Sequence, residues 1–191
     1  METRKAAGVS FISGVAAFVA LSAISILLYG RFNPERQYFS DLGAVSGPVG
    51  LTWNLGVFIL GLLVIAGAFF YSDFLRKNKD MSGLYLVSGI ALIVNSLFND
   101  MAYPVEHNIS AMAAFLTGSI ATVLAFRVVN SPWKYVAPIF GLVALLATLF
   151  LLGSTVSAVT PYPGVVELFI IIPVIAWLAV FGLSLMHADR K

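Results

Sequence analysis

Long apolar runs separated by short polar stretches dominate the sequence. Six of these runs are long enough for a transmembrane helix, which needs about 20 residues to cross the hydrocarbon core of a bilayer. They lie near residues 8–30, 52–72, 82–98, 109–128, 134–153 and 164–186. The pattern predicts an all-α, polytopic membrane protein, in which residues 1–191 form a single transmembrane domain built as a six-helix bundle.

The first apolar run is interpreted as a retained span rather than a signal peptide. Arg4 and Lys5 precede it, as basic residues precede a signal sequence. However, the run is longer than the usual stretch of about 7–15 apolar residues, and no small-x-small cleavage site follows it. We therefore count it among the six spans.

Composition supports a membrane protein and excludes several other classes. The chain is 60% hydrophobic and only 10% charged, whereas soluble domains are about 25% charged. Because it has no cysteine, disulfides, thiolate metal sites and thiol nucleophiles are excluded. A net charge of +2 gives no sign of a nucleic-acid partner. Membrane lipids are the expected partners, and a membrane-protein partner or a second copy of the chain is left open.

The distribution of Lys and Arg predicts the orientation of the bundle. If the chain has six spans, only two basic residues, Arg31 and Arg36, lie in the outer loops, and the remaining nine Lys and Arg residues lie on the other side. Basic residues accumulate on the cytoplasmic side of membrane proteins. We therefore expect a multi-pass protein of the plasma (cytoplasmic) membrane with both termini cytoplasmic. The basic residues assigned to the inside are Arg4, Lys5, Arg76, Lys77, Lys79, Arg127, Lys134, Arg190 and Lys191.

The long outer loop at residues 31–51 exceeds what a simple hairpin between two helices needs. Loops of this length within a compact domain are usually functional or disordered, and the several aromatic residues here argue against disorder. Ser40 and Asp41 lie within it, and the second span opens with Trp53 and Asn54. We expect the loop to fold back as a short amphipathic segment or lid over the outer mouth of the bundle.

A second concentration of polar residues is NDMAYPVEHN at residues 99–108, between the third and fourth spans. Asn95 and Asn99 are four residues apart and share one helix face, with Asp100 close by. The turn through Pro104 is expected to bring His107 to this face. An ionisable residue at the membrane boundary is a functional candidate because burial is costly unless it is paired. The alternative is that helix capping and hydration explain the stretch.

These patterns give a set of candidate site residues on the outer side. His107 is the candidate general acid or base, with Asp100 to orient it and Asp41 to polarise a headgroup. Three carboxylates and one imidazole would also suit a divalent metal, but no HExxH or paired histidines support this, so no metal ligand is assigned and the cofactor is unknown. Candidate substrate-binding residues are Arg31, Arg36, Asn54, Asn95, Asn99 and Glu167, of which the two arginines would attract phosphate.

The stretches YFSDLG, WNLGVFILGLL and ND...YPVEHNISAMAAFLTG resemble the DUF998 family of small six-span prokaryotic membrane proteins, which is distantly similar to the Frag1/DRAM/Sfk1 type of eukaryotic membrane protein. The resemblance extends over roughly residues 10–186. It implies a six-helix bundle with an outward-facing polar cluster and no established reaction. By analogy with the Frag1 type it suggests a lipid ligand. The positions that carry over are Asp41, Asn54, Pro104 and His107.

Three functional classes follow from the sequence. The first is a lipid-binding or accessory membrane protein, in which the outer polar cluster holds a ligand or ties the loops together. The second is a membrane-embedded lipid-modifying enzyme that uses the histidine and carboxylates. The third is a small-solute transporter, which is disfavoured because the span centres are almost purely apolar. Convergence of Asp41, Asp100, His107 and Glu167 around a cavity would favour the enzyme.

Overall fold

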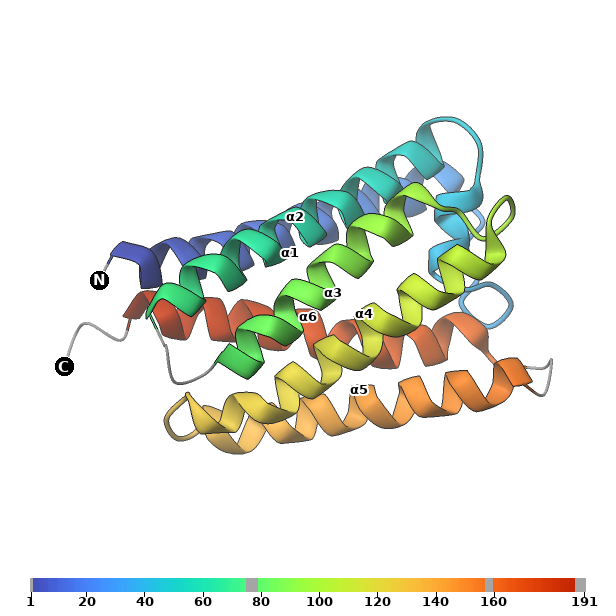
Figure 1. Ribbon diagram of the computed structural model, residues 1–191. Coiled ribbons are helices and arrows are strands. Elements are labelled where there is room, and N and C mark those ends of the chain that lie inside the picture. The colour runs from blue at the N-terminus through green and yellow to red at the C-terminus, as the bar shows by residue number, and fades with distance from the viewer. Residues whose placement is uncertain (1, 75–78, 157–159, 188–191) are drawn as a thin grey trace.

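The protein is a bundle of long helices in the computed structural model, which describes residues 2–74, 79–156 and 160–187 (Figure 1). All six long helices are apolar and long enough to cross a membrane, and the described residues contain no strand. The predicted all-α, six-helix membrane protein is therefore confirmed. The helices are α1 Glu2–Tyr29, α2 Pro48–Phe74, α3 Lys79–Leu97, α4 Pro104–Leu124, α5 Trp133–Val156 and α6 Pro163–His187, with short 3₁₀ helices η1 Ser40–Ala44 and η2 Ala125–Arg127.

Every helix begins before the apolar run that predicted it, and proline explains three of these starts. Pro48, Pro104 and Pro163 are the first residues of α2, α4 and α6. Proline suits the first turn of a helix because its fixed φ is already helical and its missing N–H would have no partner there. Hydropathy marks the part of a helix that is apolar, whereas these prolines mark where the helix begins.

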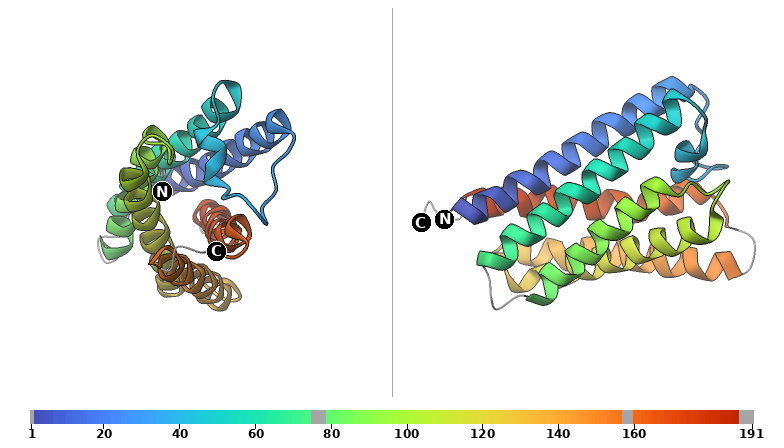
Figure 2. Two further views of the ribbon diagram at one scale, coloured as in Figure 1. Left: turned by 90° about the vertical axis from the view of Figure 1, so that its right-hand side faces the viewer. Right: turned by 45° about the horizontal axis from the view of Figure 1, so that its top comes forward.

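The helices pack mainly against their neighbours in sequence, and α6 closes the arrangement by packing against both α5 and α1 (Figure 2). Large apolar side chains remain exposed on the outside of the bundle. Leu27 is 79% exposed and Leu146 is 66% exposed. In a soluble protein such surfaces would be unfavourable, but they match the hydrocarbon that surrounds a membrane bundle.

Pairs of glycines allow two of the helix contacts to be very close. A Cβ atom added to Gly89 of α3 would lie 2.8 Å from the carbonyl oxygen of Gly61 in α2, and one added to Gly182 of α6 would lie 2.8 Å from the carbonyl oxygen of Gly8 in α1. Small residues at such contacts let helix backbones approach each other in membranes. The glycines therefore determine how tightly α2 packs on α3 and α1 on α6.

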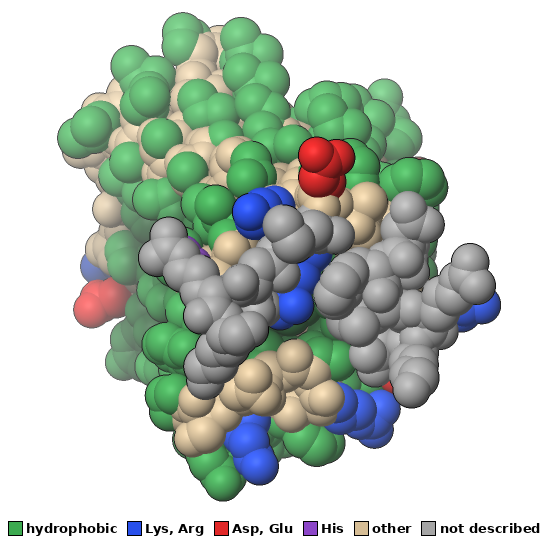
Figure 3. All heavy atoms as spheres, turned by 90° about the vertical axis from the view of Figure 1, so that its left-hand side faces the viewer, with side chains coloured by type: hydrophobic (Ala, Val, Ile, Leu, Met, Phe, Trp, Pro, Cys, Tyr) green, Lys and Arg blue, Asp and Glu red, His purple; other side chains and the backbone are tan. Residues whose placement is uncertain are grey.

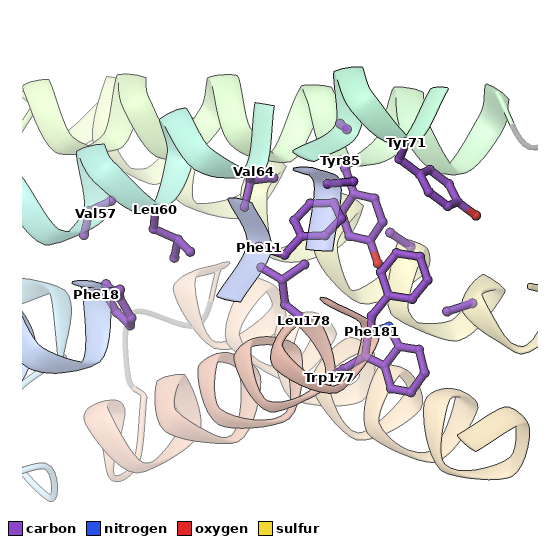
Figure 4. Packing of buried hydrophobic residues seen from close by; sticks show 14 of the residues in the cluster. Phe11, Phe18, Val57, Leu60, Val64, Tyr71, Tyr85, Trp177, Leu178 and Phe181 are labelled. Carbon is purple, nitrogen blue, oxygen red and sulfur yellow. The ribbon is translucent and has the colours of Figure 1, made fainter. Parts of the chain in front are cut away.

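Aromatic side chains fill the bundle toward the end where α1 begins (Figure 4). Phe11, Tyr71, Trp177 and Phe181 are fully buried, and Tyr85 is 3% exposed. The ring centroids of neighbouring members lie 5.3–6.1 Å apart, a normal spacing for packed aromatic rings. We call these five residues the aromatic plug, because they close the interior of the bundle at this end.

The two ends of the bundle differ in charge. Figure 3 shows Lys and Arg side chains gathered on the end where α1 begins and α6 ends. The described basic residues at this end include Lys79 at the start of α3 and Arg127 in η2, whose guanidinium lies 3.3 Å from the Asp80 carboxylate. Arg31 and Arg36 lie in the loop at the opposite end. Arg76, Lys77, Arg190 and Lys191 lie outside the described residues.

Candidate functional site

Residues 30–47, which include η1, form a lid on the end of the bundle opposite the aromatic plug (Figure 1). The Phe39 ring inserts below the lid, where it packs edge-on against Trp53 of α2 at 4.4 Å between centroids. Gly164 at the start of α6 has no room for a side chain, because an added Cβ would lie 2.9 Å from the Cα of Pro34. The lid is thus packed against the bundle, in agreement with the lid expected from the sequence.

Glu167 of α6 is the buried anchor of this lid. Glu167 is only 3% exposed. One carboxylate oxygen accepts hydrogen bonds from the backbone N–H groups of Phe39 at 2.5 Å and Ser40 at 3.1 Å. Burying a carboxylate is costly unless it is hydrogen-bonded, and the first N–H groups of a helix need acceptors. At the start of η1, the buried carboxylate therefore receives the donors that it needs, and the first N–H groups of the helix receive an acceptor.

Two further predicted residues stabilise the lid. The Asp41 carboxylate accepts the backbone N–H of Tyr38 at 2.9 Å, much as the acid of a capping box reaches back to the start of its helix. Partial burial raises the pKa of the Asp41 carboxyl above its usual value, and the nearby charge of Asp100 adds to this effect. The Asn54 side-chain amide of α2 donates to the carbonyl of Gly43 at 3.0 Å.

His107, in the first turn of α4, is 6% exposed and held in one orientation. Its Nδ1 lies 2.9 Å from the carbonyl oxygen of Phe98 and 3.2 Å from the side-chain nitrogen of Asn95. A carbonyl oxygen only accepts hydrogen bonds, so the shorter contact requires a proton on Nδ1. The Asn95 amide then donates to the His107 carbonyl at 3.2 Å instead. In the neutral ring, Nε2 therefore carries the lone pair.

The turn that brings α3 and α4 together uses Asn99 structurally. Its side-chain oxygen accepts the backbone N–H of Ala102 at 2.9 Å. Asp100 follows in the same turn and is partly exposed. Within the described residues no hydrogen bond joins Asp100 to His107, so the Phe98 carbonyl and not the Asp100 carboxylate orients the imidazole.

A cavity of about 270 Å³, which we call the outer chamber, lies beneath the lid. The lid, the α3–α4 turn, α4, α5, the residue Thr160 before α6, and α6 contribute its wall. Polar and ionisable side chains form much of this wall, although apolar residues of α4 and α5 contribute too. The lining residues are Tyr38, Ser40, Asp100, His107, Asn108, Ala111, Met112, Phe115, Leu151, Ser154, Thr160 and Glu167.

A second cavity of about 80 Å³, the inner chamber, lies next to the outer chamber, toward the middle of the bundle. The two chambers share Ser40, Ala111, Phe115 and Glu167 in their walls. The remaining wall of the inner chamber is mostly apolar, from Phe18, Trp53, Val57, Leu60, Ser88, Leu92, Asn95, Ala114, Ile170, Ile171, Val174 and Ile175. Trp177 and Leu178, which follow on α6, are buried and do not line this chamber.

The structure brings together some of the residues predicted for a site and separates others. Asp100, His107 and Glu167 line the outer chamber, while Asn95 lines the inner chamber and contacts His107. Asp41, Asn54 and Asn99 instead hydrogen-bond to backbone groups of the lid or the α3–α4 turn.

The two arginines expected to attract phosphate lie away from the chambers. Arg31 is exposed and its guanidinium stacks over the Tyr29 ring at 5.2 Å. Arg36 is also exposed, and neither residue lines either chamber. The polar wall available to a ligand therefore lacks the basic side chains that the sequence-based hypothesis placed there.

Sequence reasoning missed a chain of hydroxyl groups in the outer chamber. The Tyr38 hydroxyl donates to Thr160 Oγ1 at 2.8 Å, and Thr160 Oγ1 lies 2.8 Å from Ser154 Oγ. Ser154 lies in the last turn of α5 and Thr160 precedes α6, whereas Tyr38 is more than a hundred positions earlier. No local pattern links them. The only sequence signal is the polar composition of the stretch GSTVSAVTPYPG.

The chemistry available in the outer chamber is hydrogen bonding and proton transfer. Among the described residues, no three His, Asp or Glu side chains are grouped closely enough to hold a metal ion. The lone pair on His107 Nε2 can accept a proton or a hydrogen bond, the hydroxyl chain can donate or accept, and Asp100 can accept from a cation. These groups face a wall that becomes apolar toward the inner chamber.

Comparison with known proteins assigns the chain to a family. Neither a curated protein nor a solved structure matches this sequence. The family model described as "Protein of unknown function (DUF998)" matches residues 12–184, almost the whole length. The match agrees with the six apolar helices, each long enough to cross a membrane. The chain therefore belongs to the DUF998 family of membrane proteins, whose function is unknown.

Proposed function

We propose that this integral membrane protein binds an amphiphilic lipid in its two chambers. The headgroup would occupy the outer chamber under the lid, and a hydrocarbon chain would enter the inner chamber. The observation that carries this proposal is that a polar-walled cavity lies beside an apolar-walled one, with Ser40, Ala111, Phe115 and Glu167 in the walls of both. An amphiphile has the same division between a polar head and an apolar tail.

The size of the chambers supports one hydrocarbon chain over two. The outer chamber, at about 270 Å³, is near the lower end of ligand-pocket volumes, about 300–1,000 Å³. The inner chamber, at about 80 Å³, has room for only a short stretch of one chain. Because the buried aromatic plug fills the bundle near its other end, binding from one side is favoured over passage of a solute through the bundle.

The charge distribution supports a plasma-membrane location with both termini in the cytoplasm. The basic residues at the plug end of the bundle, among them Arg4, Lys5 and Lys134, would then face the cytoplasm. The lid and its outer chamber would open toward the outer leaflet. In this orientation, the ligand would enter from the outer leaflet and not from the cytoplasmic leaflet.

Lipid analysis of a gently purified sample tests this function. Native mass spectrometry of the wild type should show one retained lipid class at a stoichiometric level. Ala111→Trp fills the junction between the chambers and should abolish retention. Ile120→Trp is the matched control, because Ile120 lies on the same helix and is 36% exposed, so it should retain the lipid. Equal mixtures of lipids on all three proteins would contradict the proposal and favour an accessory role with a protein partner or a second copy.

A lipid-modifying enzyme is the second candidate, and the geometry of His107 favours it. Nδ1 is fixed against the Phe98 carbonyl, which leaves Nε2 as a proton acceptor on a buried ring that lines the outer chamber. A fixed imidazole next to a bound headgroup has the geometry of a general base. The step would be removal of a proton from a headgroup hydroxyl or water.

The enzyme hypothesis predicts a chemical change that depends on His107. Purified protein would be incubated with the lipid that it retains, and the lipid's mass would be followed with time. His107→Gln keeps a hydrogen-bonding side chain but has no group that titrates near neutral pH, so turnover should stop while lipid retention continues. If the wild type leaves the mass of the lipid unchanged, the enzyme hypothesis is excluded and the proposed binding function remains.

A further inference from the structure

The charges around the outer chamber indicate which headgroup it accepts. Its lining residues include two carboxylates, Asp100 and Glu167, and neither lysine nor arginine. The Glu167 carboxylate already accepts the backbone N–H groups of Phe39 and Ser40. Asp100 is different, because no hydrogen bond or ion pair is recorded for its carboxylate in the described part of the chain. It is the charge in this wall that remains available to a ligand.

Asp41 is a second carboxylate near this wall. Burial is the main cause of its raised pKa; repulsion by the charge of Asp100 acts in the same direction, and the nearby His107 opposes it. Arg31 and Arg36, the basic residues of the lid, are exposed and do not line the chamber. A cation in the chamber would relieve this repulsion, whereas a phosphate would increase it.

The cavity, rather than the acids alone, defines the site. His107 is 6% exposed and lines the chamber, and within the described residues its hydrogen bonds to other groups use Nδ1 and not Nε2. Asp100 and Asn108 also line the chamber, so a carboxylate and an amide oxygen are available as acceptors beside this nitrogen. A primary ammonium group carries three N–H donors and no acceptor. Its hydrogen bond to a carboxylate would be charge-assisted and strong.

We infer that the outer chamber selects a single-chain amphiphile with a primary ammonium headgroup over one with an anionic headgroup. This inference rests on the proposed lipid-binding function and adds the chemical class of the ligand. It replaces the hypothesis of a phosphate headgroup held by Arg31 and Arg36. The expected order of affinity is ammonium first, neutral hydroxyl second and phosphate last.

Three amphiphiles with the same twelve-carbon chain test this order. Dodecylamine, monolauroylglycerol and dodecyl phosphate would each be titrated at pH 7 into the delipidated protein in phosphatidylcholine nanodiscs, with bound copies counted by native mass spectrometry. Ala111→Trp, with its chambers blocked, gives the background from nonspecific partitioning. The amine should bind at least about tenfold more tightly than the phosphate, as expected for a charge-assisted contact.

Single substitutions assign the preference to the chamber wall. Asp100→Asn should weaken dodecylamine binding about tenfold and leave monolauroylglycerol unchanged. Glu106→Gln is the matched control, because Glu106 is an exposed carboxylate six positions away that lines neither chamber. Asn108→Asp adds a negative charge in the wall and should strengthen amine binding.

The possible outcomes separate the two proposals. Equal affinities, or tightest binding of the phosphate, overturn the ammonium preference and leave lipid binding in place. A preference that persists in Asp100→Asn and Asn108→Asp without change also overturns it, because another group would then be responsible. If no amphiphile binds the wild type above the Ala111→Trp background, the lipid-binding function itself fails.

Discussion

The carboxylate of Glu167 accepts a hydrogen bond from the backbone N–H of Phe39, a residue 128 positions earlier in the chain. This bond joins the last helix to the lid between the first two helices. The same carboxylate also accepts the N–H of Ser40 and lines both chambers. One buried side chain therefore fixes the lid and forms part of the wall of the cavity beneath it.

Replacing Glu167 should loosen the lid. Glu167→Leu leaves the N–H groups of Phe39 and Ser40 without acceptors, and each unsatisfied buried group costs about 1–3 kcal/mol. We expect a lower thermal midpoint in detergent and faster hydrogen exchange in residues 34–44. Glu106→Leu, an exposed position at the same end, is the control and should change stability by less than about 0.5 kcal/mol. Unchanged exchange in the lid of Glu167→Leu would contradict the anchoring role.

Adding a methyl group at Gly89 should separate two helices. Its Cβ would lie 2.7 Å from a side-chain atom of Ile65 and 2.8 Å from the carbonyl of Gly61, so Gly89→Ala should destabilise the bundle by about 1–3 kcal/mol. Gly83→Ala lies on the same helix with nothing within 4 Å of the added atom. It should be neutral or stabilise by up to about 1 kcal/mol, because alanine is the better helix former. Thermal unfolding of both variants tests the contact, and equal effects would refute it.

Stability should respond to pH through Asp41. Burial raises the pKa of its carboxyl in the folded state, so the folded protein binds this proton more tightly than the unfolded chain does. The resulting stabilisation is complete below the unfolded pKa of about 3.9 and is lost as the pH rises through the folded pKa. Asp41→Asn keeps an oxygen for the Tyr38 N–H without the charge. Its thermal midpoint relative to wild type should therefore be higher at pH 7 than at pH 3.5, and the reverse trend would exclude this effect.

The lid arginines should be dispensable for ligand binding. Both are exposed, and neither lines a chamber. The double variant Arg31→Gln with Arg36→Gln should bind all three twelve-carbon amphiphiles within about twofold of wild type. The reason is that charges that are exposed to water and lie outside the chamber wall are largely screened by salt. A selective loss of dodecyl phosphate binding would instead restore the phosphate hypothesis that the sequence suggested.

Cysteine labelling tests the orientation in the membrane. The natural chain has no cysteine, so a single introduced cysteine gives a clean signal. Glu35→Cys in the lid should react with a membrane-impermeant maleimide on intact cells. Arg127→Cys, at the opposite end, should react only after the membrane is opened. Labelling in the opposite order would place the chambers on the cytoplasmic side.

Hydropathy alone predicted the fold class, because a helix that crosses a bilayer must be apolar over most of its length. It also located the polar stretches at the ends of the spans, including the segment around Asp100 and His107. Helix starts were less accessible, since Pro48 and Pro104 begin helices before the apolar runs do. Glu167 was predicted from the sequence only as a substrate-binding residue; its burial and its hydrogen bonds to the lid backbone could not be predicted.

The tertiary structure decided which polar groups meet. Whether Asp100 or the Phe98 carbonyl orients His107 depends on how the α3–α4 turn closes, and whether Arg31 faces the cavity depends on how the lid folds. Tyr38 reaches Thr160, and through it Ser154, only because the lid folds over the connection between α5 and α6. Hydropathy is a local property of the sequence, and a bilayer accepts only segments that are apolar over most of their length, so the sequence by itself determined the six spans. Contacts between loops depend on packing over more than a hundred residues, and only the folded chain determines them.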